Sequence, residues 1–97
     1  MESLLQYLDE YLGTPGHPDY ATALNGLQVE GPAEVSKVVA AVDASQASIT
    51  AAAALGADLM IVHHGIFWDG HLPLTGRLGR RAKALFEAYM ALYSCHL

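Results

Sequence analysis

The feature that most constrains the fold is a set of short apolar runs spaced along the second half of the chain. KVVAAVD (37–43) is nearly continuous and rich in valine, as is typical of a buried strand. ADLMIV (57–62) and ALYSCHL (91–97) predict a second and a third strand. A shorter strand, over 27–29, follows an Asn-Gly turn signal.

The segments around these runs predict helices. Ser45 can cap a helix that continues to Leu55, and Gly56 suits the position after its end. The inner stripe of a second helix, over about 78–90, would comprise Leu78, Ala82, Leu85, Phe86 and Tyr89. An N-terminal helix over 3–12 has the stripe Leu4, Leu5, Leu8, Tyr11 and Leu12.

The order strand, helix, strand, helix, strand predicts a βαβαβ unit in an α/β fold. Right-handed crossovers make the three strands of such a unit parallel in one sheet. We therefore expect a parallel sheet flanked by helices in a three-layer arrangement, preceded by the N-terminal helix. The chain has 97 residues, which suits a single domain.

Composition narrows the classes of partner. The chain is 53% hydrophobic, and a small domain this apolar either packs tightly or buries surface against another copy or domain. Its net charge of -5 disfavours nucleic-acid binding, because domains that track phosphates usually carry a basic face. The longest apolar run is interrupted by Gly56 and Asp58 and is too short to span a bilayer, so we expect no membrane contact.

The location expected from the sequence is the cytoplasm. The single cysteine, Cys95, cannot form a disulfide within the chain, which fits a reducing compartment. The first residues, MESLLQYLDEYL, carry acidic residues rather than the basic start of a signal peptide.

Polar side chains end each of the predicted parallel strands. Asp43 ends the first strand. His63 and His64 end the second, and His96 ends the third. Ligands of open parallel sheets bind in the crevice beyond the carboxyl ends of the strands, so these metal-capable side chains are predicted to converge there. His17, in a loop with glycine and proline, is predicted to be solvated instead.

The adjacent pair His63 and His64 favours a site for two metal ions. Neighbouring side chains in a regular strand point to opposite faces, so the backbone has to leave strand geometry for both rings to serve one site, and Gly65 permits this. Two adjacent imidazoles rarely chelate one ion, but can supply one ligand to each of two ions about 3.5–4 Å apart that activate a bridging water. Imidazole suits zinc, iron, nickel or manganese. The alternative interpretation is a hydrogen-bonded structural pair.

The other candidates each have two interpretations. Asp43 either lines the site or caps the helix that follows it. Phe67 and Trp68 either wall a substrate pocket or fill the gap beneath the loop after the histidines. His96 either takes part in the site or is a satisfied histidine at a strand end.

Four blocks of sequence resemble the Ngg1-interacting-factor family, whose members are called GTP cyclohydrolase 1 type 2 homologues. The similarity runs from about Asn25 to Leu97, and the blocks stand in family order. The blocks are NGLQVEG, KVVAAVDAS, GADLMIVHHGIFW and LYSCHL. The part VHHG followed by Phe67 and Trp68 is the most specific.

The resemblance implies a dinuclear metal centre with two divalent ions. By this analogy His63 and His64 bind one ion each, and Asp43 lines the cleft. His96 would donate a proton or contact substrate, a role that suits a side chain titrating near neutral pH. The implied activity is that of a metal-dependent hydrolase acting on a small molecule through a metal-activated water. The alternative is a non-catalytic metal-binding or ring-forming scaffold or regulatory protein.

The resemblance also implies a hexameric ring and further metal ligands beyond this sequence. The family continues after His-Leu with proline and a metal-bridging aspartate, and its remaining histidine and glutamate ligands lie in a C-terminal segment. This chain stops at Leu97, on the last residues of a predicted strand. We therefore expect residues 1–97 to be a single N-terminal α/β domain that carries at most half of the metal site.

Overall fold

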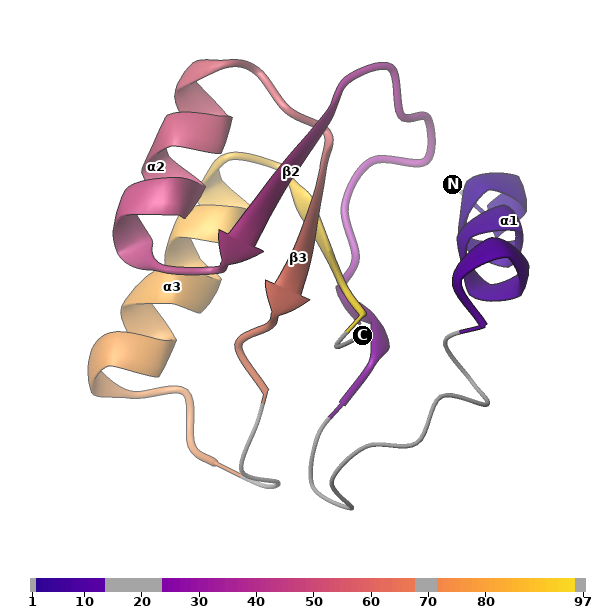
Figure 1. Cartoon of the computed structure of the whole chain (residues 1–97). Coiled ribbons are helices and arrows are strands. Elements are labelled where there is room, and N and C mark those ends of the chain that lie inside the picture. The colour runs from indigo at the N-terminus through magenta and orange to yellow at the C-terminus, as the bar shows by residue number, and fades with distance from the viewer. Residues whose placement is uncertain (1, 14–23, 68–71, 96–97) are drawn as a thin grey trace.

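The computed structural model describes residues 2–13, 24–67 and 72–95. Helices and strands alternate along most of this length, as Figure 1 shows. The elements are α1 (Glu2–Leu12), β1 (Gly26–Val29), β2 (Val38–Asp43), α2 (Gln46–Ala54), β3 (Leu59–His64), α3 (Gly76–Glu87) and β4 (Ala91–Ser94).

The strands of the described residues form one sheet in the order β1-β4-β3-β2. β2 pairs with β3 and β3 with β4 in parallel, so the predicted βαβαβ unit is confirmed. The sheet as a whole is mixed rather than purely parallel, because β1 pairs antiparallel with β4. β1 lies outside the βαβαβ unit, so the crossover rule does not set its direction.

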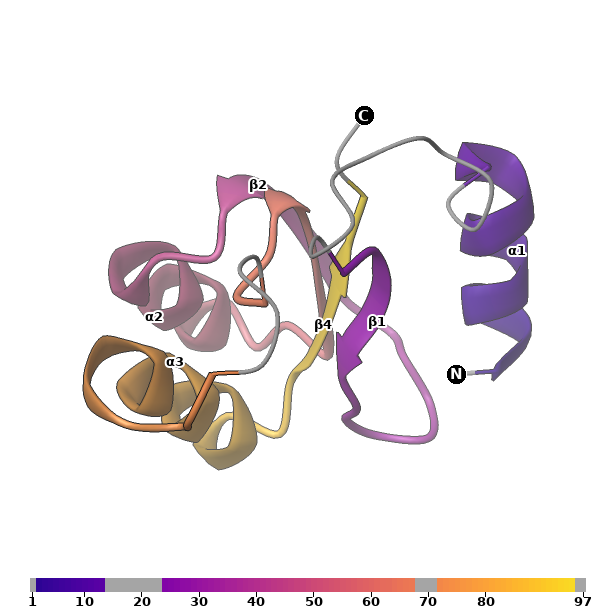
Figure 2. The same ribbon diagram turned by 90° about the horizontal axis from the view of Figure 1, so that it is seen from below.

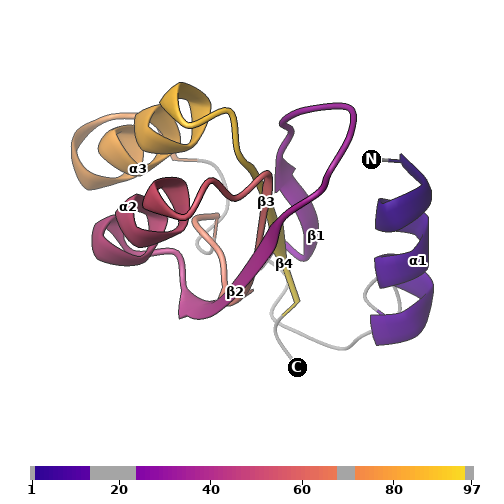
Figure 3. The ribbon, with the colours of Figure 1, turned by 90° about the horizontal axis from the view of Figure 1, so that it is seen from above.

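Helices cover both faces of the sheet and give three layers (Figures 1 and 2). α2 and α3 pack on one face, around a core that includes Ile49, Met60, Val62, Leu85 and Leu92. α1 lies against the other face (Figure 3), where Leu8 packs with Leu59, Ala91, Tyr93 and Cys95. The predicted three-layer α/β arrangement with a preceding helix is therefore confirmed.

β2 is an edge strand, and the burial predicted for it is only half right. Val39 and Ala41 pack against the core under α2 and α3. On the opposite face the side chains of Val38 and Val42 are 46% and 64% exposed. A continuous apolar run is typical of a strand that is covered on both faces. The run does not reveal which strands α1 covers, and α1 packs over β3 and β4 rather than over β2.

The predicted helix signals around α2 are confirmed. Ser45 is the N-cap, and its hydroxyl oxygen accepts a hydrogen bond from the backbone N–H of Ser48 at 3.1 Å. Gly56 follows the C-cap residue Leu55 with φ of 75°, the left-handed conformation that glycine adopts without a Cβ penalty.

α3 ends earlier than the pattern predicts. Ala82 and Leu85 are buried as expected, but Phe86 is 59% exposed and Tyr89 is 72% exposed. Tyr89 lies beyond the helix with φ of 56°, so it does not continue the inner stripe. Met90, which follows it, is buried and leads the chain into β4.

No helix within the described ranges is both long enough and apolar enough to cross a membrane.

Candidate metal centre

The parallel pairing of β2 and β3 brings Asp43 opposite His64 at the carboxyl ends of the two strands. Asp43 Oδ1 lies 2.7 Å from Nδ1 of His64. A carboxylate can only accept a hydrogen bond, so Nδ1 is the donor in this pair, and in a neutral imidazole Nε2 is then the acceptor nitrogen. Both side chains remain accessible, with 43% of His64 and 62% of Asp43 exposed.

This contact bears on the two interpretations of Asp43, whose role in a metal site stays a prediction. Its carboxylate orients His64, whereas the cap of α2 is the side chain of Ser45. The backbone carbonyl of Asp43 accepts a hydrogen bond from the Ser48 hydroxyl at 2.6 Å. The end of β2 is thus fixed to the first turn of α2, and the carboxylate is directed at the neighbouring strand.

His63 and His64 place their imidazole rings side by side. The ring centroids are 4.4 Å apart, and the ring planes meet at 67°. Both residues belong to β3, which ends at His64, so the strand runs two residues past the predicted range of 57–62. The rings approach each other although regular strand geometry directs neighbouring side chains to opposite faces.

The turn after the histidines is held by Gln28 of β1. The β1–β4 register shifts between Leu27 and Val29, so Gln28 is the extra residue of a bulge, which redirects its side chain. Its Oε1 accepts a hydrogen bond from the backbone N–H of Ile66 at 2.9 Å, and its Nε2 donates to the carbonyl of Leu24. A Cβ on Gly65 would collide with this amide, so any larger residue there would have to displace the Gln28 side chain.

A small pocket opens beside His64, with a volume of about 230 Å³. Asp43 and His64 line it from the ends of β2 and β3, and Arg81 lines it from α3. The remaining lining residues are Ala44, Ser45 and Gly65. The site therefore combines an oriented imidazole, a carboxylate and a guanidinium around one opening.

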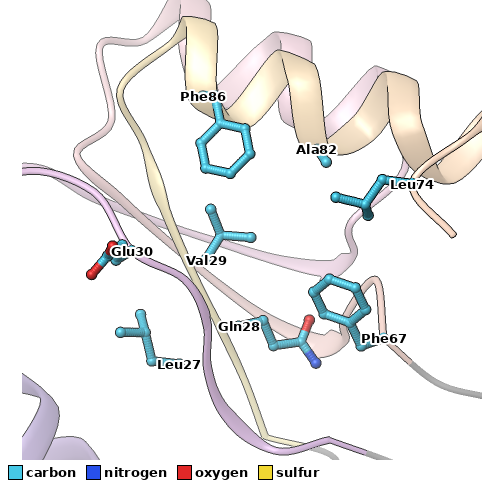
Figure 4. A pocket seen from close by; sticks show the side chains of 8 residues that line it. All are labelled: Leu27, Gln28, Val29, Glu30, Phe67, Leu74, Ala82 and Phe86. Atoms are coloured by element: carbon cyan, nitrogen blue, oxygen red, sulfur yellow. The ribbon is translucent and has the colours of Figure 1, made fainter. Parts of the chain in front are cut away.

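A second pocket, of about 380 Å³, lies between β1 and α3 and is mainly apolar (Figure 4). Phe67 lines this pocket together with Gln28 and Phe86, rather than the opening beside His64. Gln28 belongs to both regions, because its amide also binds the backbone after the histidines. The role of Phe67 at the candidate site stays a prediction.

Other predicted site residues lie outside the described part of the chain. Trp68, His96 and His17 are among them. Within residues 2–13, 24–67 and 72–95 no three or more His, Cys, Asp or Glu side chains form a group suited to hold a metal ion. The metal-ligand role of His63 and His64 also stays a prediction.

Sequence reasoning missed two residues that shape the site. Gln28 stands in the block NGLQVEG, but its reach to Ile66 depends on a bulge that no local pattern marks. Arg81 stands out in the sequence only as one of four basic residues on a helix. Its position on the same helical face as Leu78 and Leu85, spaced by three and four residues, was the signal that it faces inward.

Comparison with known proteins agrees with this architecture. The family described as Duf34/NIF3 (NGG1p interacting factor 3) matches the chain over residues 1–97. A relative from Pyrococcus abyssi named "GTP cyclohydrolase 1 type 2 homolog" is 45% identical over 96 residues, covering 99% of this chain and 38% of the relative. An Escherichia coli K12 relative with the same name is 46% identical over 95 residues, with 97% and 38% covered.

The fold of this chain is also similar to that of a solved structure. The crystal structure of TTHA1606 from Thermus thermophilus superposes with a TM-score of 0.91 at 45% identity. The superposition covers 99% of this chain and 39% of that protein. This chain thus spans about two fifths of the length of the proteins it matches.

Proposed function

This chain belongs to the Duf34/NIF3 family, and on that premise we propose that His63 and His64 are ligands of a dinuclear metal centre in a metal-dependent hydrolase. The observation that carries the proposal is the hydrogen bond between Asp43 and Nδ1 of His64. A carboxylate on the far nitrogen of an imidazole is the usual outer support of a metal-binding histidine, because it fixes the ring and raises its basicity.

The donor set fits such a centre. The two ring centroids are 4.4 Å apart, so the imidazoles lie side by side and could each supply one ligand to neighbouring ions of a two-metal site. Neutral imidazole suits zinc, iron, nickel and manganese alike, so the site does not select among them. Further ligands would come from outside the described residues, since those residues contain no larger group of ligand side chains.

The residues of the candidate site have distinct roles in this proposal. Asp43 engages Nδ1 of His64, so that Nε2 would be the nitrogen that binds a metal ion. Gln28 fixes the backbone after the histidines through the N–H of Ile66, which keeps the ring pair in place. The bound ions would supply an activated water as the nucleophile of a hydrolysis. His96 would donate the proton to the leaving group or contact the substrate.

The substrate proposed first is a purine nucleotide such as GTP. This choice rests on the name "GTP cyclohydrolase 1 type 2 homolog" that the relatives carry. The chain spans 38% of those relatives, so the activity is proposed for the whole protein.

Elemental analysis of the purified whole protein tests the metal centre. We expect bound transition metal in the parent and none in the His63→Ala/His64→Ala variant. Asp43→Asn should weaken metal affinity by about 10–100-fold, the usual effect of removing the outer partner of a ligand. The matched control is Asp58→Asn, because Asp58 precedes β3 at the opposite end of the strand from His64. Metal retained by the double variant would exclude the histidines as ligands.

Turnover is tested separately with GTP and each candidate metal, following product formation by chromatography. The parent should form product only with metal, and His64→Ala should form none. His17→Ala serves as the histidine control, since the sequence predicts no ligand role for it. Full turnover in His64→Ala would contradict the hydrolase proposal even if metal is bound.

A second candidate function is a ring-forming metal-binding scaffold. The exposed apolar face of β2, with Val38 and Val42, favours it, since contiguous apolar surface commonly marks an interface. A scaffold should assemble normally with both His63 and His64 replaced and should show no turnover. Sedimentation analysis of the double variant, beside the turnover assay, separates the two functions.

A further inference from the structure

Arg81 is half-buried, and one of its donor atoms has no acceptor. It lies on α3, and its Nε has almost no accessible surface and no hydrogen-bond partner in the described part of the chain. The ion pairs found among the described residues join His64 to Asp43 and Lys83 to Glu87, and neither includes Arg81. A buried N–H left unpaired costs free energy, more so when the group is charged, so its retention at this place needs an explanation.

The guanidinium lies at the opening beside His64. Arg81 lines the same pocket as Asp43, Ser45 and His64, facing the strand ends from α3. The acidic residue among those that line this pocket, Asp43, has its carboxylate hydrogen-bonded to His64 and forms no ion pair with Arg81. The pocket therefore contains a cation that forms no ion pair with the described residues that surround it.

The size of the pocket sets the size of the missing partner. Its volume is about 230 Å³, below the roughly 300–1,000 Å³ of pockets that enclose whole small ligands. It admits one charged group of a larger molecule whose remainder lies outside. A planar guanidinium presents its N–H groups as a fork that matches the oxygens of a phosphate or carboxylate.

We propose that Arg81 binds an oxyanion group, a phosphate or a carboxylate, of the substrate, beside the imidazole of His64. This inference rests on the proposed metal-dependent function, because it places the anchored group next to the proposed metal ligands. The anion would pair with the guanidinium where Arg81 lines the pocket and would position the rest of the substrate toward the ring pair. Arg81 is a binding residue in this scheme and takes no part in bond breaking.

Calorimetric titration of the metal-free whole protein tests the inference without relying on turnover. Inorganic phosphate and acetate are the two probes, so that the separate titrations distinguish the two kinds of oxyanion. We expect Arg81→Gln to weaken binding of the preferred anion about tenfold or more, as loss of a charge-assisted pair does. Arg81→Lys keeps the charge but loses the fork and should recover only part of the affinity.

The matched control is Arg80→Gln, which removes the same charge from an exposed neighbour on the same helix. It should leave anion affinity unchanged. Equal losses in Arg80→Gln and Arg81→Gln, no loss in Arg81→Gln, or no binding of either anion to the parent would each overturn the inference. Thermal unfolding followed by circular dichroism checks that the variants are folded. If Arg81→Gln is not folded, the anion affinities of Arg81→Lys and Arg80→Lys are compared instead, and a loss in Arg81→Lys alone supports the inference while equal affinities overturn it.

The His63→Ala/His64→Ala variant separates this inference from the function on which it rests. If that variant still binds the anion in an Arg81-dependent way while the parent binds no metal, the metal proposal fails and the anion site stands. If the parent binds metal through the histidines and Arg81→Gln binds anion as the parent does, the anion site fails and the metal centre stands.

Discussion

The central strand β4 and the edge strand β2 look alike in sequence but are held in different ways. All four residues of β4 are buried, and it pairs with a strand on each side. In β2 only Val39 and Ala41 pack into the core, whereas Val38 and Val42 on the other face are exposed. Both strands are apolar and both are parallel to β3.

Polar contacts are formed at both ends of β2. At its start, Oδ2 of Asp58 accepts hydrogen bonds from the backbone N–H groups of Ser36 and Lys37, at 2.9 and 3.1 Å. At the C-terminal end of β2, the carboxylate of Asp43 forms a hydrogen bond with His64. Packing thus fixes the centre of the sheet, and polar groups fix the edge that carries part of the candidate site.

The largest effect is expected from removing side-chain volume in β4. Leu92 is fully buried in the core under α2 and α3, so Leu92→Ala should lower the free energy of unfolding by about 2–5 kcal/mol. Urea denaturation of the 97-residue chain measures this change.

Val42→Ala in β2 is the matched control for that truncation. Its side chain is 64% exposed, so the loss should be within about 0.5 kcal/mol. Similar losses in the two variants would remove the distinction between the strands. Measuring the Leu92→Ala and Val42→Ala variants in the whole protein sharpens the comparison. A larger loss of unfolding free energy for Val42→Ala in the whole protein would mean that this face of β2 is covered.

An intermediate effect is expected from the polar contact between β4 and α1. The buried Tyr93 donates a hydrogen bond from its hydroxyl to Oδ1 of Asp9 at 2.7 Å. Tyr93→Phe should reduce the free energy of unfolding by about 1 kcal/mol, the net value of a typical hydrogen bond. Asp9→Ala completes a double-mutant cycle, and strictly additive losses would show that the bond does not stabilise the chain.

At the start of β2 the expected effect depends on pH. Hydrogen bonds from the backbone N–H groups of Ser36 and Lys37, and then from the Ser36 hydroxyl, hold the pKa of Asp58 below its usual value of 3.8. A lowered pKa in the folded state stabilises the fold at pH values above the unfolded pKa, and this stabilisation is lost as pH falls through the folded value. Asp58→Asn should therefore lower the urea midpoint at pH 6, and the difference from the parent should shrink by pH 3. A difference that is independent of pH would contradict this origin.

The smallest effect on stability is expected at the finish of β2. Both partners of the Asp43–His64 pair are substantially exposed, and such pairs typically contribute about 0–1 kcal/mol. Asp43→Asn should barely move the urea midpoint while weakening metal affinity in the whole protein. A large loss of stability would instead assign the pair to the fold.

The parts of the molecule that depend on local signals are the parts that the sequence predicts well. The three parallel strands, the Ser45 cap and Gly56 each follow from a short pattern, and the structure confirms them. The antiparallel position of β1 and the exposed face of β2 depend on which strands become neighbours, which no local pattern encodes.

The same division holds for the candidate site. The convergence of Asp43 with His63 and His64 follows from strand order alone. The contact of Gln28 with Ile66 joins residues 38 positions apart and needs a bulge, and the place of Arg81 depends on how α3 packs. Neither is visible without the tertiary arrangement.

The register between β2 and β3 makes the length of the edge strand matter more than its composition. Asp43 faces His64 because Val38 is aligned with Leu59, and the two strands keep step over the residues between. Deleting one residue from the middle of β2 would rotate every later side chain to the opposite face. Such a deletion would place an apolar side chain where the carboxylate was. The edge should therefore tolerate many substitutions on its exposed face but no change in residue number.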